Sequence, residues 1–442
     1  ATNYMLVLSD YPGLNAVRER FFPQCYYQMV RIRIAETNFD NAGVFLGKMI
    51  ENGPHDPLTE HAVLFFGQSL SDSGFGAQAR NAFARFEQLF PKSPLRPQAE
   101  LATARSFISE RDWTNALTHF TGWIAAHPED PLRPQADFAR AWVFYQAGQE
   151  TNAFNAFTNF VSQFRTNELA AQAQNWIADY YGDQENWLMS EQSYQAVFQS
   201  TNWPASPLMY RAKLMAARTA FYHQGYADAR AYLTNVIADL HCPPEILPEA
   251  FFILGDVFVE SKILDSTNAL NNFVDAISAF SRITQQYPTD RLAPLAWGKI
   301  GDCHFQLAAQ DPKSYDEATN AYAKILDGKW AVIPAAAIDQ AEVGMGLVLE
   351  KKAETKLGKE QVALWRTALD RYLNVVYERH PQAKQADPFW MKKAGIAAGR
   401  VAELLGDKEA AAKLYQRLAD RLPAMKATWD KKREALETGG AL

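Results

Sequence analysis

The histidine and cysteine side chains of this sequence could act as metal ligands, bases or nucleophiles. The 442 residues include eight His and three Cys, spread along the whole chain. Metal ligands on one helix need i, i+3 or i+4 spacing, because adjacent side chains point in different directions. Motifs such as H-E-x-x-H and C-x-x-C are absent, so the sequence predicts no metal site. The close pairs are all adjacent in sequence: Glu60 with His61, His241 with Cys242, and Cys303 with His304.

Phosphate loops and catalytic motifs are also absent. Gly344 and Gly346 lie in an apolar helical run and lack the third Gly and the preceding strand of a nucleotide-binding fingerprint. There is no nucleophile elbow, and three separated cysteines form no disulfide framework. The sequence therefore predicts no catalytic residue, no cofactor and no enzyme activity. A serine, histidine and acid constellation assembled only by the fold stays open as the alternative.

Composition indicates a globular chain: 48% of the residues are hydrophobic and 21% are charged. The net charge of -6 argues against nucleic acid as a partner. No apolar run is long enough to span a membrane. The charge is uneven, because residues 351–442 hold 19 Lys and Arg against 12 Asp and Glu, a net +7, which leaves −13 on the rest. We interpret the basic end as a soluble cap of the fold, with a docking surface for an acidic partner or anionic lipid as the alternative.

The main signal is an internal repeat of 37 residues. The segment Leu95–Glu100 recurs almost unchanged as Leu132–Asp137. A small residue recurs with the same period, a large apolar residue follows it by four positions, and Pro often follows eight positions later. The small residues are Ala42, Ala79, Ala116, Ala153 and Ser190, and the large ones are Leu46, Phe83, Phe120, Phe157 and Tyr194.

This pattern predicts pairs of antiparallel helices. An offset of four places the small and the large residue on one helix face, where the small side chain lets a second helix approach closely. The closing Pro ends the helix, because the residue before Pro disfavours the α conformation. A further Pro, such as Pro97 or Pro134, begins the other helix of the pair, where its missing N–H costs nothing.

The small residue, the small-then-aromatic pair and the closing Pro resemble the tetratricopeptide repeat (TPR), although 37 exceeds that family's usual period of about 34 residues. The resemblance implies an all-α fold, an α-solenoid of about ten antiparallel helix pairs in a right-handed superhelix. The chain then divides into the end of a truncated repeat (1–12), regular 37-residue repeats (13–203), longer and more divergent repeats (204–423), and a basic C-terminal capping helix and tail (424–442).

The linkers, with Tyr or Phe before Pro and a short polar spacer, resemble those of bacterial cell-envelope TPR proteins of the outer-membrane assembly lipoprotein and Tol–Pal coordinator type. This resemblance implies a periplasmic or cell-envelope protein, with the cytoplasm as the alternative. We expect a non-enzymatic scaffold that binds a protein or peptide partner. The alternative is a structural subunit of a larger assembly or filament.

The resemblance also implies that the first helix of each pair lines a concave binding face. Its residues then become mixed polar and aromatic in the first half and acidic in the second, which favours a partner helix or extended peptide with basic and apolar residues. An ordinary solvated helix face is the alternative. The predicted partner-binding residues are Gln98, Arg105, Gln135, Trp142, Tyr145, Asp179, Arg211, Arg218, Phe221, Asp256, Glu260, Asp302 and Phe305.

Overall fold

The computed structural model describes residues 2–203, 206–261, 269–328, 330, 333–382 and 385–438. These residues form 22 α-helices and one short 3-10 helix, and none of them lies in a β-strand. The predicted all-α fold is confirmed. Ala1 and the last part of the predicted C-terminal tail, 439–442, lie outside the described residues.

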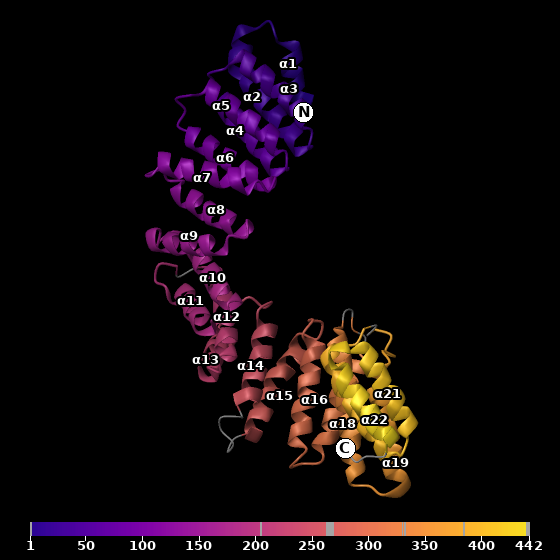
Figure 1. Cartoon of the computed structure of the whole chain (residues 1–442). Helices are drawn as coiled ribbons and strands as arrows, with labels where there is room; N and C mark the ends of the chain where they lie inside the picture. Colours follow the sequence, from indigo (N-terminus) through magenta and orange to yellow (C-terminus); the bar gives the residue numbers. More distant parts are fainter. Residues whose placement is uncertain are drawn as a thin grey trace. The chain divides into compact units, whose positions relative to one another are not determined.

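The chain divides into two compact units, which we call the N-terminal unit (Ala1–Leu208) and the C-terminal unit (Met209–Leu442). In the N-terminal unit, eleven helices follow one another in chain order (Figure 1). They are α1 (Thr2–Asp10), α2 (Asn15–Ala35), α3 (Phe39–Asn52), α4 (Pro57–Asp72), α5 (Gly76–Leu89), α6 (Arg96–Ser109), α7 (Trp113–Ala126), α8 (Arg133–Gln146), α9 (Glu150–Gln163), α10 (Glu168–Asp183) and α11 (Trp187–Gln199).

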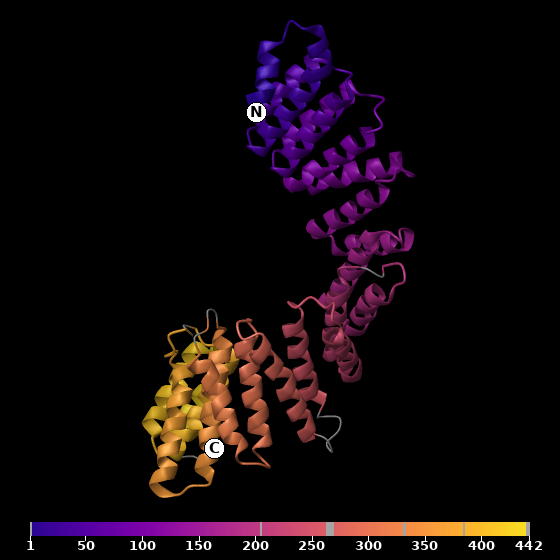
Figure 2. The ribbon, with the colours of Figure 1, turned by 180° about the vertical axis from the view of Figure 1, so that it is seen from behind.

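The C-terminal unit has the same kind of succession, seen from magenta-red through orange to yellow in Figure 2. Its helices are α12 (Met209–Tyr222), α13 (Tyr226–Ala238), α14 (Leu247–Ser261), α15 (Ala269–Gln286), α16 (Ala293–Leu307), α17 (Ser314–Leu326), α18 (Ala335–Glu354), α19 (Gly358–Val376), α20 (Pro388–Leu404), α21 (Lys408–Arg421), the 3-10 helix η1 (Pro423–Met425) and α22 (Lys426–Thr438).

The even-numbered helices α2 to α20 are the first helices of pairs, and α3 to α21 are their second helices. Each first helix packs against the second helix that follows it, so the described residues form ten antiparallel pairs. This confirms the predicted α-solenoid. Helix α1 packs on α2 before the first pair, and α22 packs on α21 after the last. The predicted repeat classes, with their boundary at 203/204, stay predictions, as does the right-handed superhelix.

The small and large residues of the repeat meet as the sequence predicts. A Cβ added to Gly67 would lie 2.4 Å from the ring of Phe83, and one added to Gly255 would lie 2.4 Å from the ring of Phe280. These aromatic rings of the second helices thus lie directly on the backbone of the first helices. Because no side chain separates ring and backbone, even one methyl group at these glycines would force the helices apart.

The turns inside the pairs keep the period of 37 residues exactly in the N-terminal unit. The second residue after each first helix of this unit adopts a positive φ, which lets the chain reverse and satisfy the last carbonyls of the helix. Two of these positions are Gly, and the others carry side chains that strain the backbone. The residues are Thr37 (56°), Gly74 (85°), Arg111 (58°), Gly148 (72°) and Glu185 (56°).

Side-chain hydrogen bonds precede the first helices at the same period. Before four of them, an oxygen accepts a hydrogen bond from the N–H two residues later, at Asp56, Ser93, Asp130 and Asn167. Asp56 and Asn167 are the N-cap residues of α4 and α10 and satisfy donors that these helices leave free. Ser93 and Asp130 lie two residues before the N-cap residues of α6 and α8.

Neighbouring first helices lie closer together than neighbouring second helices do. First helices of successive pairs contact each other, for example α4 with α6, α8 with α10 and α18 with α20. In the part of the chain that the structure describes, successive second helices lack comparable contacts, and open grooves separate α3 from α5, α5 from α7 and α9 from α11. The first helices therefore line the inner side of each unit, which we call the first-helix face.

Candidate partner-binding face

In the N-terminal unit, the first-helix face carries a chain of aromatic rings on α8 and α10. Trp142 and Tyr145 are 38% and 43% exposed, with ring centroids 5.5 Å apart. The ring of Tyr145 meets Trp176 edge-on at 5.4 Å, and Trp176 stacks on Tyr180 at 5.7 Å. This surface offers large apolar area at a low entropic cost of binding, because each ring is already held in place.

Buried rings behind this surface hold it rigidly. Phe157 of α9 is fully buried and contacts Trp176 at 4.5 Å and Trp142 at 6.3 Å between centroids. Ala141, a small residue of the first helix α8, is also fully buried and lies one position before Trp142. The close packing that the repeat requires therefore turns Trp142 outward.

Polar residues flank the aromatic rings on α6 and α8. Arg105 is exposed and donates a hydrogen bond from Nη2 to Oε1 of Gln135, 3.3 Å away on the next first helix. Desolvation lowers the pKa of Arg105 and outweighs the opposing effect of Asp72. Gln98 is half-buried on the same helix as Arg105. These donors and acceptors could orient a peptide backbone beside the rings.

Asp179, which the sequence also assigns to this face, takes part in bonds within the solenoid. Its carboxylate accepts hydrogen bonds from the hydroxyl of Tyr194 and from Nδ2 of Asn175, the latter at 3.0 Å. A partner would have to compete with these two donors for Asp179.

In the C-terminal unit, the predicted acidic residues also bind neighbours in the solenoid. Asp256 of α14 forms an ion pair of 2.8 Å with Lys299 of α16. Burial opposes the charge of Lys299, but the Asp256 carboxylate outweighs it and raises the lysine pKa. Asp302 accepts hydrogen bonds from Tyr322 at 2.7 Å and from Gln340 at 2.6 Å, while burial raises its pKa.

The remaining predicted residues of the C-terminal unit lie on α12, α14 and α16. Arg218 forms an ion pair with Glu249 across the first two of these helices. Phe221 meets Tyr226 at 5.8 Å and Phe305 meets Tyr315 at 5.7 Å, in each case a ring of the second helix of the same pair. Arg211 is exposed and Glu260 is half-buried.

The structure thus brings Arg105, Gln135, Trp142 and Tyr145 together on neighbouring first helices and places the acidic residues in separate networks. Sequence reasoning missed Trp176 and Lys299. A signal was present for both. Trp176 lies two positions before the small residue of its helix, where the two preceding repeats have Ala102 and Ala139, and Lys299 occupies the corresponding position before Gly301.

A metal site and a membrane-spanning helix would each require specific features of the described residues. No group of three or more His, Cys, Asp and Glu side chains there is arranged to hold a metal ion. None of the described helices combines the length and the apolar character that crossing a bilayer requires.

Comparison with known proteins adds the family. A family model of the tetratricopeptide repeat matches two overlapping segments, residues 66–131 and 101–158. No curated protein matches the sequence.

Three solved structures are similar at low identity. The C-terminal part of a TPR repeat-containing protein from Cytophaga hutchinsonii is 13% identical, with 63% of this chain and 98% of that chain covered and a TM-score of 0.45. A tetratricopeptide repeat protein from Parabacteroides merdae is 13% identical, with 65% and 98% covered and a TM-score of 0.35. Yeast Tom70 is 12% identical, with 96% and 91% covered and a TM-score of 0.39.

The 37-residue register, the contacts of the small and aromatic residues, and the family match agree. Residues 66–158 match the family model of the tetratricopeptide repeat, within a chain whose described residues form an α-solenoid of helix pairs.

Proposed function

We propose that this chain is a non-enzymatic protein–protein interaction scaffold that binds a peptide or protein segment on the first-helix face of the N-terminal unit. The observation that carries this proposal is the exposed pair Trp142 and Tyr145, held rigidly by Trp176 and Phe157. Trp and Tyr are the residues most often found as energetic hot spots of interfaces, because they bury much area with few rotatable bonds. The partner that fits is a helix or extended segment with an apolar side chain for the rings and polar groups for Arg105 and Gln135.

The test is the affinity of the partner for variants of the full chain. The wild-type protein is used to isolate the partner from the native source, and the dissociation constant is then measured by calorimetry. Trp142→Ala should weaken binding about tenfold or more, because truncating a hot spot typically costs over 1 kcal/mol. Leu188→Ala is the control, since Leu188 is an exposed apolar residue on the second helix α11. Equal affinities of wild type and Trp142→Ala would refute the proposed face.

The acidic half of the predicted face calls for a different variant. Asp256→Arg would place a cation against Lys299, its present ion-pair partner, and would disturb the solenoid itself. Glu260→Gln removes an acid of the same region and leaves the ion pair of Asp256 with Lys299 intact. Reduced affinity of this variant would extend the binding face into the C-terminal unit.

We further propose a periplasmic or cell-envelope location in a bacterium. The support for it is the resemblance of the linkers between helix pairs to those of envelope TPR proteins. Fractionation of the native source tests it, and recovery of the protein with cytoplasmic markers alone would contradict it. The alternative, a structural subunit of a larger assembly, predicts a large particle in place of a monomer or dimer on size-exclusion chromatography with mass detection.

A further inference from the structure

A groove opens between the second helices α5 and α7, on the side of the N-terminal unit away from the first-helix face. Its volume is about 540 Å³, and α6 forms its floor. Glu87 of α5 and Glu100 of α6 line it together with the rings of Phe107, His119 and Trp123. Grooves of the same kind lie between α3 and α5 and between α9 and α11.

The repeat register shows that Glu87 is exceptional. At intervals of 37 residues, the same helix position holds Ile50, Ile124 and Val161. Ile50 and Ile124 are each 8% exposed and belong to the core, and Val161 packs on the core from its edge. A carboxylate therefore occupies a position that three other regular repeats fill with an aliphatic side chain and a fourth with Phe198, at a cost in desolvation.

Glu87 has no compensating contact. Within the described residues, its carboxylate has neither a hydrogen bond nor an ion pair. Burial, followed by the charge of Glu100, raises the pKa of Glu87. Arg80 lines the same groove, where its guanidinium lies over the ring of Phe107 at 4.3 Å and forms an ion pair of 2.9 Å with Glu110 in place of one with Glu87.

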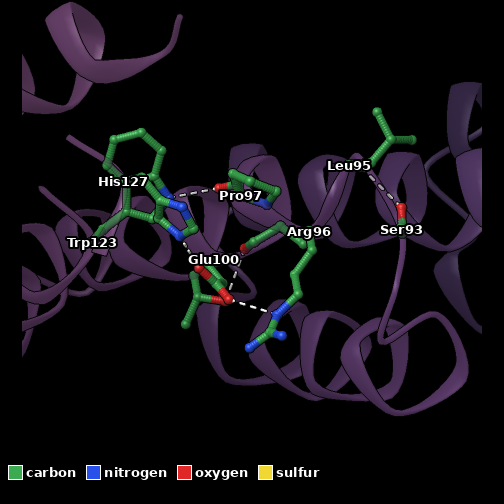
Figure 3. A network of polar contacts seen from close by, with 9 residues as sticks. Ser93, Leu95, Arg96, Pro97, Glu100, Trp123 and His127 are labelled. Atoms are coloured by element: carbon green, nitrogen blue, oxygen red, sulfur yellow. Dashed lines mark hydrogen bonds and ion pairs between the residues drawn. The ribbon is translucent and has the colours of Figure 1, made fainter. Parts of the chain in front are cut away.

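Glu100 is a second carboxylate of the same groove, and the next repeat has Asp137 at its position, paired with Arg133 and Arg140. Its counterparts are Val63 in the groove between α3 and α5 and Gln174 in the groove between α9 and α11. Glu100 is fixed by Arg96, 2.8 Å away, and by Nε2 of His127 at 2.7 Å (Figure 3). Of the three grooves, the one between α5 and α7 thus combines two carboxylates.

Flat rings form the walls beside these carboxylates. Phe107 and His119 stack with centroids 5.0 Å apart, and the indole of Trp123 is fixed by a hydrogen bond of 2.8 Å from its Nε1 to the carbonyl of Pro97 (Figure 3). Rings with a carboxylate behind them suit a cation on an apolar stem, since the stem packs on the rings and the cation reaches the negative charge.

The rims of the groove are low. Ala84 on α5 and Gly122 and Ala126 on α7 line it and are exposed, and a Cβ added at Gly122 would meet no atom within 4 Å. A polypeptide backbone could therefore lie along the groove, close enough for one of its side chains to enter.

We propose that the groove between α5 and α7 is a second binding site of the scaffold, which takes an arginine or lysine side chain of a partner polypeptide between the ring walls and against Glu87. This site opens between second helices, is independent of the first-helix face, and is specific to one of the three grooves because Glu87 and Glu100 meet in that groove.

The test uses the full chain labelled with ¹⁵N at its tryptophans, with the indole signal of Trp123 assigned through Trp123→Phe. The probe is the peptide acetyl-Gly-Gly-Arg-Gly-Gly-amide, and the matched neutral probe replaces Arg by citrulline. The Arg peptide should shift the Trp123 signal saturably. The citrulline peptide should bind with an affinity at least about tenfold lower, as expected for loss of a charge-assisted hydrogen bond.

Variants separate Glu87 from general charge effects. Glu87→Gln should weaken the Arg peptide about tenfold, whereas Glu150→Gln, which removes an exposed acid at the start of α9, should leave it unchanged. Glu87→Ile, the residue of the neighbouring repeats, should abolish binding while the protein melts at or above the wild-type temperature. Trp142→Ala should not alter binding, which keeps this test separate from that of the first-helix face.

Three results would overturn the proposal: equal affinity for the Arg and citrulline peptides, equal affinity of wild type and Glu87→Gln, or a response to spermidine but not to the Arg peptide. The last result would assign the groove to free polyamines.

Discussion

The two units differ in whether the aromatic residues of their repeats need a hydrogen-bond acceptor on the first helices. In the N-terminal unit, Phe83, Phe120 and Phe157 fill the pocket beside the small residue and need no polar partner. In the C-terminal unit, three of the corresponding residues are Tyr, and each donates its hydroxyl to a carboxylate of a first helix. These pairs are Tyr322 with Asp302 (2.7 Å), Tyr372 with Glu350 (2.5 Å) and Tyr415 with Glu403 (2.7 Å).

This difference affects which residues of the first helices remain available to a partner. A buried hydroxyl must find an acceptor, so each of these three Tyr residues engages a carboxylate of a first helix. Phe leaves the first helices of the N-terminal unit free to carry Arg105 and Trp142 outward. Tyr194, which donates to Asp179, is the one such case in the N-terminal unit that the described residues show, and it falls in the last pair of that unit. We therefore expect partner binding mainly in the N-terminal unit.

The largest expected effect concerns the apolar packing of the N-terminal unit. Phe120→Ala should lower the free energy of unfolding by about 3–5 kcal/mol, because it removes a fully buried ring and leaves a cavity. Ala116→Leu, at the fully buried small position of the same helix, should cost about 1–3 kcal/mol by overpacking. Denaturant unfolding followed by circular dichroism measures both. Curves that coincide with the wild type would show that the register is wrong.

A pH effect is expected from a buried carboxyl group of the C-terminal unit. Asp339 of α18 is 2% exposed, and burial raises its pKa to about 6, with Glu342 and Glu378 adding to the shift. Since the folded-state pKa lies above the unfolded value, the folded state binds the proton more tightly, and stability falls as the pH rises from about 4 to about 6. Asp339→Asn should therefore stabilise the protein at pH 7.5 by on the order of 2 kcal/mol and have little effect near pH 4.

Thermal melts of wild type and Asp339→Asn at both pH values test this. The Asn can still accept the hydrogen bond that Oδ2 of Asp339 receives from the N–H of Asp387 at 2.9 Å. A stabilisation of equal size at both pH values would mean that the charge of Asp339 is not its cause.

Exchanging Tyr and Phe between the units sharpens the comparison directly. Tyr372→Phe should cost about 1–3 kcal/mol, because it leaves an oxygen of the buried Glu350 without its donor. The reverse change, Phe157→Tyr, should also destabilise, since Phe157 is surrounded by the rings of Phe138, Trp142 and Trp176. If Phe157→Tyr were neutral, the hydroxyl would find an acceptor in the N-terminal unit too, and the contrast between the units would not hold.

The smallest expected effect concerns the turns. Arg111 has a φ of 58° at a position where other repeats have Gly74 or Gly148. Arg111→Gly should stabilise by about 0.5–1 kcal/mol, because Gly relieves the strain of the left-handed conformation and loses part of that gain to its freer unfolded state. Glu185→Gly, with a φ of 56°, is the parallel variant in a later repeat. Destabilisation by both would show that the Arg111 and Glu185 side chains contribute more than the strain costs.

Much of the fold could be predicted from the sequence, because a repeat states the same packing rule several times. Three features predicted the ten pairs and their register: the small residue, the large residue four positions after it, and Pro at helix starts. The acceptors of the tyrosines could not be predicted. Asp302 meets Tyr322 across 20 residues, and Lys299 meets Asp256 from the next first helix, contacts that depend on helix rotation and side-chain rotamers.

The candidate face was predicted in part for the same reason. Trp142 and Tyr145 follow from their offsets to Ala141, since exposure of a first-helix position depends on the register alone. Trp176 contacts Tyr145 but occupies a position where the two preceding repeats have Ala. From the sequence alone it could not be distinguished from a core aromatic residue. Its contact with Tyr145 requires the stacking of neighbouring pairs.

Site-specific photocross-linking in the native source tests the central claim most directly. A photoreactive phenylalanine is placed at Tyr145 on the first-helix face, and at Leu188 on the second helix α11 as the control, and cross-linked residues are identified by mass spectrometry. We predict that the probe at position 145 yields one partner segment, and that Trp142→Ala in the same chain abolishes this cross-link. A cross-link to the same partner from position 188 alone, or one that Trp142→Ala leaves unchanged, would contradict binding at the first-helix face.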